Sequence, residues 1–236
     1  MGLDETVGRV AGLWGVDLWG VADLGPAAQF IVEQGGEAVA GYPRAFVMGI
    51  ALPHAVVDQL PRRQDWAVKV AYRHQYDTVN RRLDLVASQV TTLLQQQGFP
   101  ALPVPASERV DSERICGVFS HKLAAHLAGL GWIGRSCLLV TPQMGPRLRW
   151  VTVLTDAPLE PTGASLADGC GACRECVDIC PIGALTGEPF RADEPREVRY
   201  DAAACDRYFR EMSAEKRGSD VCGLCVYACP HGRERT

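Results

Sequence analysis

The 236-residue sequence lacks the features that place a protein in or across a membrane. No apolar run approaches the length of about 18 residues that indicates a transmembrane helix. The N-terminus, MGLDETVGRV, has neither the basic segment nor the apolar segment of a signal peptide, and it carries no twin-arginine signal. These absences predict a cytoplasmic protein without a membrane partner.

Cysteine is almost absent from the first two-thirds of the chain and concentrated in the rest. Residues 1–160 hold only Cys116 and Cys137, whereas residues 170–229 hold the other eight. Many cysteines in a cytoplasmic chain favour metal ligands over disulfides. The change in composition, at a Pro- and Gly-rich stretch, predicts two domains, residues 1–160 and residues 161–236.

The front part mixes strand and helix patterns. The short apolar run AFVMGIAL (45–52) predicts a buried strand, and a stripe of apolar side chains from Tyr72 to Leu93 predicts a helix. A second helix is expected after Ser120, a favourable N-cap residue. SCLLVT (136–141) and WVTVLT (150–155) predict two strands around a turn. The expected fold class is therefore α+β or α/β.

The back part opens with the spacing C-x2-C-x2-C-x3-C-P. Its members are Cys170, Cys173, Cys176, Cys180 and Pro181. In two-cluster bacterial ferredoxins, the first three cysteines of such a run bind one [4Fe–4S] cluster and the fourth binds the other. The spacing therefore predicts a ferredoxin-like module with two clusters.

A second, incomplete copy of the motif lies near the end of the chain. Its members are Cys222, Cys225, Cys229 and Pro230. Ser219 stands where the first copy has Cys170, so one ligand is missing locally. Cys205 is the nearby cysteine that can replace it.

The two copies together supply two complete ligand sets. We expect cluster 1 to be bound by Cys170, Cys173, Cys176 and Cys229, and cluster 2 by Cys180, Cys205, Cys222 and Cys225. Four thiolates on each cube leave no open iron site, which favours electron transfer over Lewis-acid chemistry. The alternative is two structural zinc sites, because C-x2-C pairs also bind zinc. The C-x3-C-P endings and the crossed repeat favour the clusters.

Net charge and histidine spacing limit the other functions. The formal charge is −4, and two clusters would bring it to about −8, an unfavourable overall field for a nucleic acid. His121 and His126 lie five residues apart, which does not align two ligands on one helix face.

Cys137 is expected to be a buried residue of a strand. For Cys116 we consider both an inert buried thiol and a reactive one.

Three stretches of the sequence resemble one enzyme family along almost the whole chain. They are GVDLWGVADLG, AFVMGIAL, and the run VDSERICGVFSHKLAAHLAGLGWIGRSCLLVTPQMGPRLRWVTVLTDAPL that precedes CGACRECVDICPIGAL. These segments resemble epoxyqueuosine reductases, which are cobalamin-dependent enzymes of tRNA modification, and more distantly reductive dehalogenases. The AGLGWIG segment and the crossed cysteine pattern carry most of the resemblance.

The resemblance implies a fold, a cofactor and a set of site residues. It implies a nitroreductase-like domain that binds base-off cobalamin, followed by the ferredoxin-like module, with a donor such as ferredoxin or flavodoxin. The absence of an Asp-x-His-x-x-Gly motif agrees with a corrinoid that has no histidine ligand. Asp111, in RVDSER, matches the acid that supplies a proton in the family. Corrinoid contacts are expected in GRSCLLVTPQMGPR, at Arg135, Ser136 and Met144.

The main hypothesis is a reductase that depends on cobalamin and iron–sulfur clusters, with epoxyqueuosine in tRNA as the substrate. The acidic charge, VDSER in place of the family's VDSAP, and a chain that stops six residues after Pro230, without the family's helical-repeat extension, weaken the case for tRNA. A non-enzymatic two-cluster electron carrier without cobalamin is the first alternative. A reductive dehalogenase-like enzyme is the second.

Overall fold

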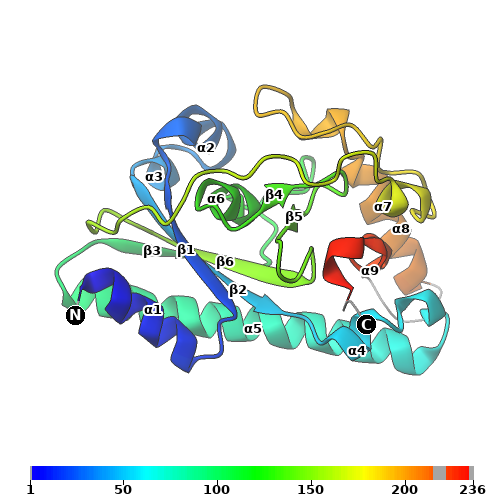
Figure 1. The fold of residues 1–236 in the computed structure, drawn as a ribbon, viewed down its shortest axis with the longest axis horizontal. Helices are drawn as coiled ribbons and strands as arrows, with labels where there is room; N and C mark the ends of the chain where they lie inside the picture. Colours follow the sequence, from blue (N-terminus) through cyan, green and yellow to red (C-terminus); the bar gives the residue numbers. More distant parts are fainter. Residues whose placement is uncertain (1, 215–221, 234–236) are drawn as a thin grey trace.

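The computed structural model describes residues 2–214 and 222–233 of the chain (Figure 1). The helices are α1 (Leu3–Leu13), α2 (Ala28–Gly35), α3 (Glu37–Ala40), α4 (His54–Val57), α5 (Trp66–Gln96), α6 (His121–Leu127), α7 (Glu175–Asp178), α8 (Ala202–Ala214) and α9 (Leu224–Ala228). The strands are β1 (Leu18–Asp23), β2 (Arg44–Ala51), β3 (Ala101–Val104), β4 (Trp132–Ile133), β5 (Leu139–Val140) and β6 (Leu148–Thr155). Short 3-10 helices lie at Gly25–Ala27, Leu60–Arg62, Arg196–Val198 and Pro230–Gly232.

A four-stranded antiparallel sheet, in the order β1-β2-β6-β3, forms the centre of the molecule. Figure 1 shows α1 and α5 on one side of this sheet and α2, α3 and α6 on the other. The segments with α7, α8 and α9 gather near one end of α5. The mixed α/β class is therefore confirmed. None of the described helices combines the length and apolar character that a membrane span needs.

Strand β2 confirms the prediction for residues 45–52, and both of its faces are buried. Phe46 and Met48 point into the core on the α5 side, whereas Ala45 and Val47 point into the core on the α6 side. Helices cover both faces of the sheet, so the strand is a continuous apolar run and does not alternate with polar residues.

Helix α5 confirms the predicted stripe and connects the two parts of the chain. Its apolar face packs on β2, β3 and β6, and its first turns carry the buried Tyr72. Cys222 and Leu224, from the cysteine-rich part, belong to the same buried core as Tyr72. The predicted parts, 1–160 and 161–236, thus meet in one core.

The region around residues 120–145 departs in detail from the sequence prediction. Ser120 does occupy the N-cap of α6, but its side chain makes no capping hydrogen bond among the described residues. The stretch 136–141 contains only a two-residue strand, β5, which pairs with β4 in a separate small sheet. Cys137 lies in the turn before β5 with a positive φ of 56°, so its placement in a strand was wrong. Its predicted burial is confirmed, since 4% of it is exposed.

Gly49 in β2 provides a test of this packing. A methyl group at this position would lie 2.6 Å from the ring of Trp150, its cross-strand partner. We expect Gly49→Ala to destabilise the protein by ~1–3 kcal/mol through overpacking. The thermal unfolding midpoint should fall by ~2–4 °C for each kcal/mol. Gly12→Ala, in an open position of α1, is the matched control and should be neutral or stabilising. An unchanged midpoint for Gly49→Ala would contradict the described packing.

Candidate iron–sulfur site

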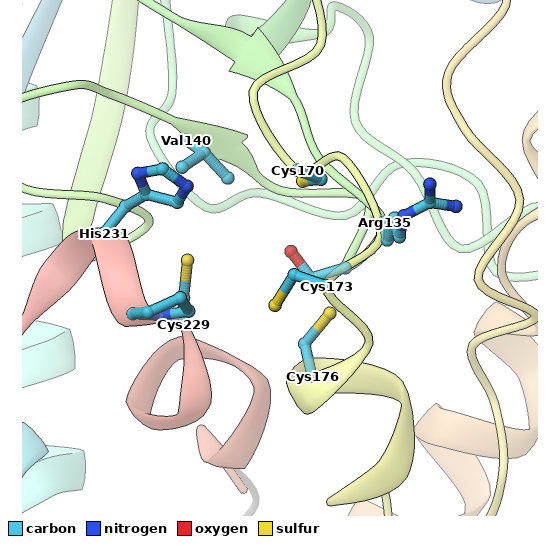
Figure 2. A pocket seen from close by; sticks show the side chains of 9 residues that line it. Arg135, Val140, Cys170, Cys173, Cys176, Cys229 and His231 are labelled. Carbon is cyan, nitrogen blue, oxygen red and sulfur yellow. The ribbon is translucent and has the colours of Figure 1, made fainter.

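Four thiols from separate segments line one pocket, which Figure 2 shows from close by. They are Cys170, Cys173, Cys176 and Cys229. The first two lie in the loop before α7, the third lies in α7, and the fourth follows α9. The structure therefore brings together the four cysteines that the spacing predicts for cluster 1.

The crowding of these thiols indicates what the pocket can bind. Burial, followed by the neighbouring thiols of Cys170 and Cys229, raises the pKa of Cys176 to about 12. Burial also raises the pKa of Cys229, to about 11. Several thiolates packed this closely repel one another unless positive charge lies between them. The donor set therefore fits an iron–sulfur cube, in which thiolates bind the irons.

The cysteines predicted for cluster 2 also lie close enough to affect one another's ionisation. They are Cys180, Cys205, Cys222 and Cys225. Burial raises the pKa of Cys225, and the thiols of Cys222 and Cys205 raise it further. Cys180 acts on both Cys205 and Cys222. Cys205 in α8 thus lies where the displaced ligand was expected.

Hydrogen bonds reach the sulfur atoms of this second set. The hydroxyl group of Tyr200 donates to the thiol of Cys205. The backbone N–H of Ala184 donates to Cys180 Sγ, with an N–S distance of 3.4 Å. Such bonds help to set the reduction potential of a cluster. Ser219, which replaces the first cysteine in the second copy, lies outside the described residues.

The three residues expected to contact a corrinoid lie in two different places. Arg135 and Ser136 line the pocket of cluster 1. Arg135 donates hydrogen bonds to the carbonyl oxygens of Gly171 and Gly187. Met144 packs against the buried core on the α6 side. Arg135 and Ser136 thus have a place beside the thiols, while their contact with a corrinoid stays a prediction.

Asp111 closes a tight turn in the loop before α6. Its Oδ1 accepts hydrogen bonds from the backbone N–H groups of Glu113, at 2.9 Å, and Arg114, at 2.7 Å. Its backbone pairs with that of Cys116 in both directions. Arg196, from the cysteine-rich part, donates to the carbonyl of Arg114. The carboxyl therefore has a structural role in the turn, and its role as an acid stays a prediction.

The two helix histidines are occupied by separate partners. His121 Nε2 lies 3.0 Å from the Pro105 carbonyl, which can only accept, so Nδ1 accepts from the Thr152 hydroxyl at 2.9 Å. Burial lowers the pKa of His121 to about 4, so the ring is neutral at neutral pH. His126 Nδ1 bonds the Gly131 carbonyl at 3.0 Å. Both histidines are thus polar residues of α6 with separate hydrogen-bond partners, and the expectation that they do not act as paired ligands stays a prediction.

Cys116 belongs to neither of the two predicted ligand sets. It is partly exposed. Its backbone N–H donates to the Asp111 carbonyl, and its own carbonyl accepts from the Asp111 N–H. Partial exposure leaves open both an inert and a reactive thiol at this position.

Two residues beside the clusters have roles that the sequence did not reveal. Tyr72, which the apolar stripe predicted only as a core residue, packs on Gly223, between two cluster-2 cysteines. A methyl group on Gly223 would lie 2.6 Å from the ring of Tyr72. Arg147 is fully buried, forms an ion pair with Asp58 at 2.7 Å, and packs on Gly232 just beyond the last cysteine. No motif marks Arg147.

The site and the fold define a class of protein: a mixed α/β protein with two iron–sulfur clusters. Residues 169–232 match the 4Fe-4S double cluster binding domain family. An epoxyqueuosine reductase of Listeria monocytogenes is 44% identical over 121 residues, which are 50% of this chain and 31% of that protein. The chain is therefore a relative of epoxyqueuosine reductases, and the resemblance seen in its sequence is confirmed. It spans less than half the length of the curated relatives it matches.

Solved structures show the same fold at lower identity. A catabolic reductive dehalogenase is 21% identical and superimposes with a TM-score of 0.74, over 98% of this chain and 32% of that one. An epoxyqueuosine reductase with an epoxyqueuosine-modified tRNA stem loop is 19% identical, with a TM-score of 0.60, over 99% of this chain and 66% of that one. These likenesses support the fold alone.

Cys205 gives the sharpest test of the ligand sets. We expect Cys205→Ser to damage cluster 2 selectively and to lower the iron content from about eight to about four per chain. Cys116→Ser is the matched control and should keep about eight, because Cys116 lies outside both sets. Iron analysis and the visible spectrum of protein purified without oxygen measure the effect. A Cys205→Ser protein with about eight irons and an unchanged spectrum would contradict the assignment.

Proposed function

We propose that this chain is an iron–sulfur oxidoreductase of the epoxyqueuosine reductase type. In this proposal, residues 161–236 hold two [4Fe–4S] clusters, and residues 1–160 form a nitroreductase-like domain for a base-off cobalamin and the substrate. The observation that carries the proposal is the pair of four-thiol sets, one lining a pocket and one packed against α5. The similarity to epoxyqueuosine reductases supports the choice of reaction.

The two thiol sets differ in their surroundings, which suggests a direction for the electrons. The four thiols of the first set line a pocket. In the second set, Cys222 belongs to the main buried core, together with Tyr72 of α5. Electrons would therefore enter at cluster 1, from a donor such as ferredoxin or flavodoxin, and pass through cluster 2 to the front domain. Complete ligation by four thiolates suits this transfer role.

The residues fit the clusters more directly than they fit a corrinoid. When bound, cobalamin would supply a strongly reducing cobalt centre. Both ring nitrogens of His121 are hydrogen-bonded, and His126 bonds the Gly131 carbonyl, which agrees with a corrinoid that takes no histidine from α6. Arg135 and Ser136 lie beside the cluster-1 thiols, and their contact with a macrocycle stays a prediction.

Asp111 is the proposed proton donor. Both backbone N–H groups bonded to its carboxyl go to Oδ1, so Oδ2 is the oxygen that carries the proton in this proposal. Arg196 fixes the same turn through the Arg114 carbonyl. The proton source is thereby attached to the part of the chain that carries the electrons.

Epoxyqueuosine in tRNA is the proposed substrate, because the relatives share that activity in name. A two-cluster electron carrier without cobalamin and a reductive dehalogenase-like enzyme are the competing functions. Protein whose clusters are reduced, but which turns over neither epoxyqueuosine-containing tRNA nor a halogenated aromatic compound, would favour the carrier.

Asp111→Asn tests the proton donor without disturbing the turn. An asparagine oxygen still accepts both N–H groups, so only the acidic proton is lost. We expect turnover of epoxyqueuosine-containing tRNA to be abolished while the reduction of the clusters by dithionite is unchanged. Glu113→Gln, a charge change in the same turn, is the control and should retain activity. Unchanged turnover in Asp111→Asn would remove Asp111 from the mechanism.

A further inference from the structure

The AGLGWIG segment singled out in the sequence has no role in the proposed reaction, yet the structure places it against cluster 1. Strand β4 carries Trp132, and the turn to β5 carries Gly134, Arg135 and Ser136. The last two residues line the thiol pocket. The segment from Gly131 to Ser136 therefore borders that pocket at its Arg135–Ser136 end, and we term it the cluster-1 wall.

Trp132 makes a side-chain hydrogen bond from this wall to a cluster thiol. The residue is 6% exposed, and its indole N–H donates to Cys170 Sγ with an N–S distance of 3.3 Å. The indole is fixed on two sides. A methyl group on Gly169 would lie 2.7 Å from the ring, and His231 stands edge-on at a centroid distance of 4.9 Å. The N–H group is thus held in its direction toward the sulfur.

The glycines of the cluster-1 wall permit this approach. A methyl group on Gly134 would lie 3.2 Å from Cys170 Sγ and 2.8 Å from the side chain of Val140. A methyl group on Gly131 would lie 2.3 Å from the Val140 carbonyl oxygen. Side chains at these positions would push β4 away from β5 and from the thiol. The spacing of glycines around Trp132 therefore serves contact with the cluster.

We propose that Trp132 sets the reduction potential of cluster 1 through its hydrogen bond to Cys170. Reduction adds negative charge to the cube and its thiolates, and an N–H donor stabilises that added charge. The bond therefore raises the potential and makes cluster 1 a better electron acceptor. The inference rests on the proposed cluster 1, but it is independent of the corrinoid, of Asp111 and of the substrate.

Trp132→Phe is the direct test, because it keeps an apolar ring and removes the N–H donor. An EPR-monitored redox titration of the cluster-loaded protein gives the midpoint of each cluster. The signal that survives in Cys205→Ser identifies cluster 1. We expect the reduction equilibrium of cluster 1 to become about tenfold less favourable, a fall of ~59 mV for one electron. The midpoint of cluster 2 should not change, and the iron content should remain about eight.

Trp150→Phe is the matched control, because that ring packs over Gly49 in the sheet. It should leave both midpoints unchanged. A Trp132→Phe protein with about eight irons and an unchanged cluster-1 midpoint would overturn the proposal. An equal fall at both clusters would also overturn it, because it would indicate a general loss of packing. Wild-type protein without a cluster at Cys170 would instead contradict the proposed ligand set.

A second measurement covers the case in which Trp132→Phe loses its iron. Wild-type protein is labelled with tryptophan that carries ¹⁵N in the indole ring, and reduced cluster 1 is examined by electron spin echo modulation. A ¹⁵N coupling is expected, because one indole nitrogen lies in hydrogen-bond contact with a ligand sulfur. Absence of any ¹⁵N coupling to cluster 1 would overturn the proposal.

Discussion

The mutual repulsion of eight crowded thiolates is the constraint on which the rest of this structure depends. Burial and neighbouring thiols raise the pKa of Cys176 and Cys225, so both sets need a positively charged core between them. Each predicted cube draws ligands from both motif copies, with Cys229 in the first set and Cys180 in the second. The crossed ligation ties two distant segments together and fixes the point at which Cys222 enters the core of the front part.

The front part connects to this centre through loops as well as through α5, and none of the expected cluster ligands belongs to it. The loop with Asp111 is attached to the cysteine-rich part at two places. Arg196 bonds the Arg114 carbonyl, and Arg109 forms an ion pair with Asp206, the neighbour of Cys205. The β4–β5 segment approaches the other cluster through Trp132. The segment 196–206, which carries Cys205 of cluster 2, therefore also holds the loop with the proposed proton donor.

The sequence predicted the features that depend on spacing and periodicity. It identified β2 and α5, because burial on two faces and a helical stripe each leave a pattern, and it grouped the eight cysteines. It misplaced Cys137, since a positive φ in a tight turn leaves no pattern in a run of apolar residues. It did not reveal the burial of Arg147 or the bond from Trp132 to Cys170, because both depend on contacts between segments far apart in the chain.

Metal analysis tests the central claim most directly. Protein purified without oxygen and supplied with cobalamin is analysed for iron and cobalt, together with its visible spectrum. The account predicts about eight irons and one cobalt per chain, with the absorption of cubane clusters and of a base-off corrinoid. About eight irons without cobalt would contradict the corrinoid and favour an electron carrier. Zinc in place of iron would contradict the clusters themselves.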